Sequence, residues 1–274
     1  MTLASAIMLL AGGLAAGFAS GMLGLGGAFI ITPVQYLVYT GMGLPADLAI
    51  KTAFGTSMLV VLPTAVSGAW RHHRKQSVSW RAAAIMGSCS LVVALGAATL
   101  ATHLSGSALK TAFGAIVLLS GFRTITARPP QGERGLVDNP WLWAAWAIPV
   151  GFVAGIFGVG GGIIMIPVFV LAFRFKMHYA IGTSLAVMIL TSLGGIAGYI
   201  INGIGVPGRL SYSLGYVNIP AWLLLAVPSA AMAQAGALTA HKIPQKPLMY
   251  IFMIVIIYMG LKMIGVFDWL GWPV

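Results

Sequence analysis

The hydrophobic residues of this chain fall into ten segments separated by short polar joints. Several segments are about 20 residues long, which is enough for a helix to cross the hydrocarbon core of a bilayer. The others are shorter and are interrupted by glycine. The pattern predicts an all-α polytopic membrane protein. The segments cover residues 3–20, 26–40, 52–70, 82–102, 108–126, 141–157, 160–174, 180–202, 217–240 and 247–267.

Two blocks of sequence occur twice, in the same order. Residues Gly17–Val34 align without gaps to Gly151–Val168, with nine of eighteen positions identical. Residues 53–68 align to 180–195 with seven of sixteen identical. Such self-similarity is the signature of internal duplication. We therefore predict an N-terminal repeat over 1–126, a cytoplasmic linker over 127–140 and a C-terminal repeat over 141–274.

Each half is predicted to contain a glycine-broken helical hairpin and three transmembrane helices. If the hairpin returns to the side it entered from, three further crossings place the second half upside down relative to the first. This topology puts 11 Lys and Arg residues on the cytoplasmic side and 4 outside, whereas eight plain spans give at best 9 against 6. The positive-inside rule therefore favours two inverted repeats with both termini extracytoplasmic. The predicted cytoplasmic residues are Arg71, Arg74, Lys75, Arg81, Arg123, Arg128, Arg134, Arg174, Lys176, Lys242 and Lys246.

Composition agrees with a membrane protein. Hydrophobic residues make up 59% of the 274 residues and charged residues 7%, and the mean hydropathy is +0.97. An ordinary soluble domain is about 25% charged and is excluded. The net charge of +11 would favour nucleic acid as the partner of a soluble protein. Here the basic residues lie in the joints, so we interpret them as topology signals and expect the bilayer as partner, not nucleic acid.

The two glycine-rich loops, 24–27 and 158–162, are the strongest candidates for a binding site. Glycine breaks helices and leaves main-chain amides uncovered, which a membrane tolerates only where protein or a polar ligand satisfies them. If a half-helix begins after each loop, its free amides and positive dipole end favour an anion. The candidate residues are Gly24, Gly26, Gly27, Gly158, Gly160, Gly161 and Gly162.

Other glycines and two prolines have simpler interpretations. Glycines spaced by four residues before each loop predict close helix packing. These are Gly13, Gly17 and Gly21 in the first half, and Gly151 and Gly155 in the second. Pro33 and Pro167 are expected to kink the second arm of each hairpin.

Hydroxyl pairs at matching places in the two halves form a second candidate group. Thr56 and Ser57, and likewise Thr183 and Ser184, lie early in the helix after each hairpin. Each hydroxyl has two alternative hydrogen-bond partners: an anion, or the main-chain carbonyl four residues earlier in its own helix. Weaker candidates are Thr64 and Thr191, whereas Gln35, Asn202, Asn218 and Gln234 are expected to serve helix contacts.

Acidic residues are scarce. The four carboxylates, Asp47, Glu133, Asp138 and Asp268, all fall in predicted joints or at the C-terminal edge. Cation sites and proton relays in membranes usually use buried Asp or Glu, so an anion is the favoured substrate. An enzyme would need a nucleophile with a base, paired aspartates or a metal motif at membrane depth. The sequence offers none, so we expect no enzymatic activity, cofactor or metal.

The doubled pattern of a glycine loop, a proline and an Ala-x-Gly-Thr-Ser segment resembles the TauE/SafE family of sulfite and organosulfonate transporters. The segment Trp70–Arg81 also resembles that family's cytoplasmic joint, although Ser79 stands where an acidic residue is common. The resemblance covers both halves. It implies a bacterial or archaeal cytoplasmic (inner) membrane permease for sulfite, sulfonates or related sulfur oxyanions.

The leading hypothesis is thus a secondary transporter that holds such an anion between the two loops and works by alternating access. An anion channel, a membrane scaffold and a transporter of another small anion remain as alternatives.

Overall fold

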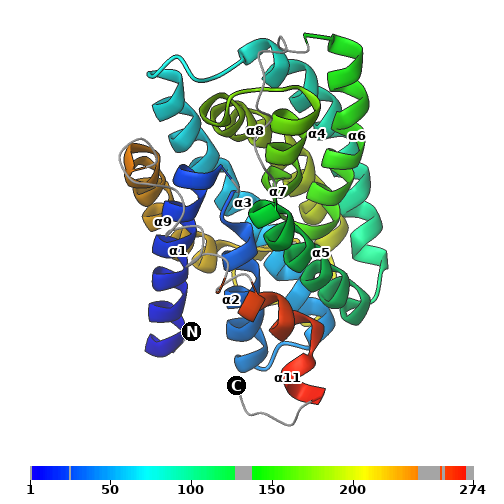
Figure 1. The fold of residues 1–274 in the computed structure, drawn as a ribbon. Coiled ribbons are helices and arrows are strands. Elements are labelled where there is room, and N and C mark those ends of the chain that lie inside the picture. Colours follow the sequence, from blue (N-terminus) through cyan, green and yellow to red (C-terminus); the bar gives the residue numbers. More distant parts are fainter. Residues whose placement is uncertain (1, 25, 127–137, 240–253, 255–256, 270–274) are drawn as a thin grey trace.

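The computed structural model describes residues 2–24, 26–126, 138–239, 254 and 257–269. The chain folds into helices with one two-stranded hairpin (Figure 1). The first half contains α1 (Leu3–Leu23), α2 (Ala28–Gly41), α3 (Ala46–His73), α4 (Trp80–His103) and α5 (Gly106–Thr126). The second contains α6 (Pro140–Phe157), α7 (Gly162–Pro167), η1 (Val168–Ala172), α8 (Met177–Gly203), β1 (Ser213–Leu214), β2 (Val217–Asn218), α9 (Ile219–Thr239) and α11 (Val266–Trp269).

Six helices are long and apolar enough to cross a membrane, namely α1, α3, α4, α6, α8 and α9. The prediction of an all-α polytopic membrane protein is confirmed. Helices α3 and α8 are the most buried: 78% and 67% of the most apolar stretch of each lies inside the protein, so they form its centre. In α4 and α9 the buried share of this stretch is 39%, which leaves most of their apolar surface for lipid.

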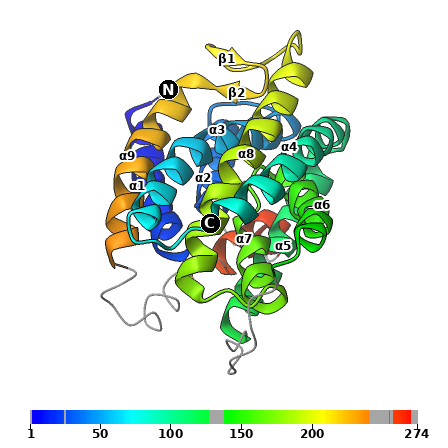
Figure 2. The ribbon, with the colours of Figure 1, turned by 90° about the horizontal axis from the view of Figure 1, so that it is seen from above.

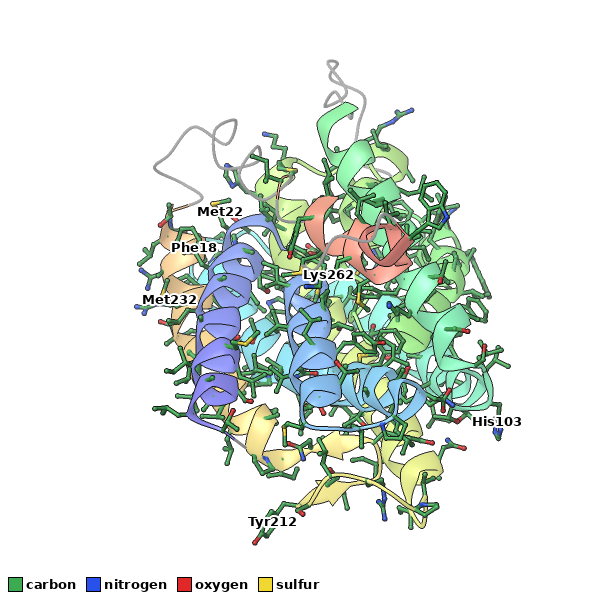
Figure 3. All side chains as sticks on the ribbon, turned by 90° about the horizontal axis from the view of Figure 1, so that it is seen from below. Phe18, Met22, His103, Tyr212, Met232 and Lys262 are labelled. Carbon is green, nitrogen blue, oxygen red and sulfur yellow. The ribbon has the colours of Figure 1, made fainter. Side chains whose placement is uncertain are left out.

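The outer helices pair across the two halves. Helix α1 packs along α9 on one side of the molecule, and α6 packs along α4 on the other, with α3 between the two pairs (Figure 1). Phe18 and Met22 of α1 lie on the same side as Met232 of α9 (Figure 3). Each half therefore completes its packing with a helix of the other half.

Glycine makes these pairs close. A β-carbon at Gly17 would lie 2.5 Å from Ser229 Cα, and one at Gly155 would lie 2.7 Å from Ala97 Cβ. Gly13 and Gly21 also face α9, and Gly151 faces Ser90 of α4. The helix backbones thus approach too closely for any side chain, as in other small-residue helix interfaces. The prediction that the glycines before the loops serve helix packing is confirmed.

The central helices α3 and α8, which carry the second repeated block, run in opposite directions. Near the start of α3, a β-carbon at Gly55 would lie 3.0 Å from Tyr199 Cβ near the end of α8. Near the start of α8, one at Gly182 would lie 2.9 Å from His72 Cβ at the end of α3. Opposite insertion of the two halves in a bilayer stays a prediction.

The second arms differ between the halves. Helix α2 continues through Pro33 as an α-helix. In the second half α7 ends at Pro167 and gives way to the π-helical turn η1, as expected where a proline removes a main-chain donor. The linker predicted over 127–140 lies mostly outside the described residues, and so does much of the segment 247–267.

The short hairpin between α8 and α9 was not predicted. Its strands pair Ser213 with Asn218 and Leu214 with Val217, and Gly215 at the turn has a φ of 58°. The hairpin lies at one edge of the helical bundle (Figure 2), and Tyr212 extends from it with 83% of its surface exposed (Figure 3). The Tyr216 amide donates to the Tyr199 carbonyl, which fixes the hairpin to the end of α8.

Candidate functional site

The chain is broken at both glycine loops. Helix α1 ends just before Gly24, and α2 begins after Gly27; these two glycines have φ values of 68° and 69°. Helix α6 ends just before Gly158, and α7 begins after Gly161; these two have φ values of 65° and 89°. A residue with a β-carbon is strained in these left-handed conformations, so glycine is favoured at both ends of each break. The predicted helix breaks are thus present in both halves.

The two loops meet inside the protein. A β-carbon at Gly26 would clash with Met188 Cε and lie 3.3 Å from the Val159 carbonyl oxygen. A β-carbon at Gly160 would lie 2.8 Å from Val61 Cγ1 and 3.1 Å from the same Met188 methyl group. Met188 therefore lies against both loops. Val61 and Met188 occupy corresponding positions in the two repeats.

The flanking glycines have another role, because they seat each loop on a central helix of the other half. A β-carbon at Gly158 would lie 2.6 Å from Phe54 Cα on α3. One at Gly24 would lie 3.1 Å from Ile181 Cα on α8, and Phe54 and Ile181 correspond in the repeat. These glycines allow main chain to approach main chain. They position the loops, whereas Gly26 and Gly160 face the space where the loops meet.

Within their own half, the last loop glycines also pack against the first arm of the hairpin. A β-carbon at Gly27 would lie 2.9 Å from the Ala16 carbonyl carbon, and one at Gly161 would lie 3.0 Å from Val150 Cγ1. Gly162 is buried as the first residue of α7. These contacts hold each break at a fixed angle.

The loop amides are the groups most suited to a ligand. Within the described residues, the main-chain NH groups of Gly26, Gly27, Gly160 and Gly161 have no backbone hydrogen-bond partner. Buried NH groups in native proteins are almost always paired, so unpaired ones require an explanation. Successive amides in left-handed and turn conformations form concave sites that bind anions. The arrangement therefore suits a small anion.

Thr56 and Thr183, two of the predicted ligand residues, already have partners. The Thr56 hydroxyl accepts from the Asn218 amide at 2.9 Å, and the Thr183 hydroxyl accepts from the Ser79 amide at 3.0 Å. Asn218 and Ser79 precede α9 and α4, and their side chains accept from the first-turn amides of Ala221 and Ala82, respectively. These threonines thus fix the start of a helix in the opposite half.

The two corresponding serines differ. Ser184 donates to the carbonyl of Gly24 and to that of Ile181, so its hydroxyl is used within the first loop and its own helix. Ser57 lies 2.9 Å from the Thr32 hydroxyl of α2 and donates to Gln35 Oε1 at 3.4 Å. Thr32, Gln35 and Ser57, which we call the α2–α3 polar cluster, are fully buried.

The weaker candidates serve packing. Thr64 and Thr191 donate to the carbonyls of Val60 and Val187 four residues earlier, and Thr191 also pairs with Ser90 at 2.6 Å. This is the back-bonding alternative expected from the sequence.

Sequence reasoning missed Met188 and Ser192. Met188 is an apolar residue in an apolar helix, so the sequence contained no signal for it. Ser192 is fully buried, and its hydroxyl would lie 3.5 Å from a β-carbon at Gly160. The corresponding residue of the first half is Ala65, so no matching pair marked this position.

Two of the four carboxylates are already paired. Asp47, in the first turn of α3, forms an ion pair with Lys51 at 2.8 Å, and its other oxygen accepts from the Gly106 amide at 2.6 Å. Asp138 pairs with Arg81 at the protein surface. No group of three His, Cys, Asp or Glu side chains that could hold a metal occurs in the part of the chain that the structure describes.

Comparisons with known proteins agree with this architecture. The family model for sulfite exporter TauE/SafE matches residues 9–263. A probable membrane transporter protein of Methanocaldococcus jannaschii is 28% identical over 92% of this chain and 92% of its own length. One from Haemophilus influenzae is 26% identical over 94% and 97%. The probable membrane transporter protein YunE of Bacillus subtilis is 28% identical over 96% and 100%. No solved structure matches the chain. The family match spans both glycine loops and both central helices, and the chain therefore belongs to the sulfite exporter TauE/SafE family.

Proposed function

We propose that the protein is a secondary transporter that binds a small sulfur oxyanion, such as sulfite or a sulfonate, between its two glycine loops. The observation that carries the proposal is the meeting of Gly26 and Gly160 around Met188, with loop amides that have no backbone partner among the described residues. The sulfite in the family name supports the choice of anion.

The chemistry of the surroundings supports an anion over a cation. Buried hydrogen-bond donors can replace the water that an oxyanion loses on entering the membrane. The loops offer main-chain NH groups, and Ser192 offers a buried hydroxyl that has no other partner among the described residues. A cation would need carboxylates or several converging carbonyls at the same depth. Asp47 and Asp138, the carboxylates whose side chains the structure describes, are held elsewhere by ion pairs.

Alternating access follows from how the loops are seated. Each loop rests on a central helix of the other half, the first on α8 and the second on α3. Relative movement of α3 and α8 then carries the two loops apart, on one side of the protein at a time. The Met188 methyl group fills the space between the loops, so it has to move aside before an anion enters. This motion belongs to the rocking class of transporter mechanisms.

The proposed orientation places both termini outside the cytoplasmic membrane of a bacterium or archaeon. The basic residues between α3 and α4 and those after η1 then face the cytoplasm, in accordance with the positive-inside rule. Reporter fusions at the two ends test this. Alkaline phosphatase should be active and green fluorescent protein dark at each terminus, and the reverse pattern would refute the orientation.

Flux measurements test the function itself. Proteoliposomes should take up labelled sulfite or methanesulfonate with saturable kinetics, and unlabelled substrate should compete. Gly160→Leu and Gly26→Leu, which fill the space between the loops, should abolish uptake. Gly43→Leu is the matched control, because Gly43 has a φ of 86° but no atom within 4 Å of its β-carbon position. Uptake at the wild-type rate in Gly160→Leu, or linear flux without competition, would refute the proposal.

A further inference from the structure

The two glycine loops have chemically different surroundings. The first loop faces apolar side chains, because a β-carbon at Gly24 would lie 2.9 Å from Ile181 Cγ2 and 3.0 Å from Ile166 Cδ1. Gly26 faces the methyl group of Met188. The Ser184 hydroxyl, which reaches this loop, is already bonded to two carbonyls. The Ser20 hydroxyl in the last turn of α1 is buried without a partner among the described residues, but it is not among the three atoms nearest to any β-carbon position of this loop.

The second loop has spare polar groups. The Ser192 hydroxyl is fully buried, has no hydrogen-bond partner within the described residues and lies 3.5 Å from the β-carbon position of Gly160. A buried hydroxyl without a partner costs about 1–3 kcal/mol. Removing it would therefore make the empty protein more stable, and its presence requires a compensating use.

Gln35 is the second spare group. Its side chain is fully buried, its Oε1 accepts from Ser57, and its Nε2 has no partner in the part of the chain that the structure describes. Ser57 lies one helical turn from Phe54 and one turn from Val61, the α3 residues that contact Gly158 and Gly160. The α2–α3 polar cluster therefore lies beside the second loop, and one end of the carboxamide remains available there.

The repeat shows that these polar groups are not a general requirement of the fold. The positions that correspond to Thr32 and Ser192 are Ile166 and Ala65, and continuing the alignment by one residue pairs Gln35 with Phe169. An apolar residue thus suffices at each place in the other half. Each half has a glycine loop, and among the described residues only the second loop has an unpaired side-chain hydroxyl next to the β-carbon position of its central glycine.

On this basis we propose that Gln35 and Ser192 bind the oxygen atoms of the substrate at the Gly160 loop, so that the side-chain donors of the oxyanion subsite lie on this side. The inference rests on the proposed function. The Gly26 loop contributes main-chain NH groups, and the apolar side chains of Ile166, Ile181 and Met188 close this side of the substrate. The substrate is therefore held in one orientation, with most of its oxygen atoms toward the Gly160 loop.

Thermal unfolding of the full-length protein in detergent, titrated with sulfite and with methanesulfonate, tests the assignment. Ser192→Ala and Gln35→Met should leave the melting temperature of the ligand-free protein unchanged or higher, because each removes an unpaired buried group. Each should weaken anion binding about tenfold, the loss expected for one hydrogen bond to a charged ligand. Gln35→Glu, which replaces a donor by a carboxylate, should abolish binding at pH 8.

Thr191→Val is the matched control. Thr191 is the neighbour of Ser192, but its hydroxyl is satisfied by Ser90 and by the Val187 carbonyl. This variant should lower the melting temperature and leave anion affinity unchanged. If the wild type is stabilised by the anions and the Ser192 and Gln35 variants are stabilised equally, the subsite is refuted while the transport proposal stands. If neither anion stabilises the wild type, both proposals fail.

Discussion

Gly158→Ala should be one of the most damaging single-methyl changes in the protein. The added β-carbon would lie 2.6 Å from Phe54 Cα and 2.8 Å from the Phe54 carbonyl carbon. Both are main-chain atoms of α3, so no rotamer change can relieve the contact. The loop and the helix have to separate, and the seat of the second loop on the first half is lost.

The magnitude can be separated into two parts. A left-handed φ of 65° costs alanine about 1–2 kcal/mol. Forcing an extra carbon into a packed contact costs about 1–3 kcal/mol more. Gly43→Ala measures the first part alone, since Gly43 has a φ of 86° and open space around it. The change in unfolded-state entropy is the same for both variants and cancels in the comparison.

Equilibrium unfolding of the two variants in mixed micelles gives the difference directly. Gly158→Ala should be less stable than Gly43→Ala by about 1–3 kcal/mol. Truncation of the Phe54 side chain should not rescue it, because the obstructing atoms belong to the main chain. A difference below about 0.5 kcal/mol would show that the loop is not seated on α3 as described.

Three further predictions use the same unfolding assay. The β-carbon of Gly26→Ala would press against the flexible end of Met188. Adding Met188→Ala should therefore reduce the loss of unfolding free energy in the double variant by about 1 kcal/mol relative to the sum of the two single variants. Simple additivity of the two losses would contradict the contact. Thr56→Val leaves the buried Asn218 amide unpaired and should cost about 1–3 kcal/mol with substrate affinity unchanged. A loss of affinity at unchanged stability would instead make Thr56 a ligand. Asp47→Ala removes the acceptor of the Gly106 amide and should cost about 1–2 kcal/mol. Lys51→Met should cost less than about 1 kcal/mol, since half of the Asp47 side chain is exposed and its ion pair is screened. A larger loss in Lys51→Met than in Asp47→Ala would reverse this assignment.

The helices and their breaks could be predicted because both depend on local sequence. Segments such as 82–102 and 180–202 correspond to α4 (Trp80–His103) and α8 (Met177–Gly203), since about 20 apolar residues have no other stable conformation in lipid. The helix breaks could be predicted from the glycine-rich loops, and at Gly24 and Gly158 the chain takes a left-handed conformation.

The partners of individual side chains could not be predicted, because they depend on which helices become neighbours. The local sequence around Thr56 and Thr183 is compatible with a hydroxyl that binds a ligand. In the structure, each hydroxyl accepts a hydrogen bond from a main-chain amide more than 100 residues away in the sequence. The position of Met188 between the loops depends on the tertiary structure, which brings two loops far apart in sequence against it. The hairpin β1–β2 was missed for a related reason, since it is too short for periodicity and depends on its bond to Tyr199.

The exchange of outer helices between the halves has a consequence for synthesis. When the ribosome has produced only residues 1–126, the glycine face of α1 has no partner, because Leu225, Ser229 and Ala233 of α9 do not yet exist. That face stays open to lipid until almost the entire chain has been inserted. The two halves therefore cannot mature one after the other, and the protein reaches its final packing only after α9 closes over α1.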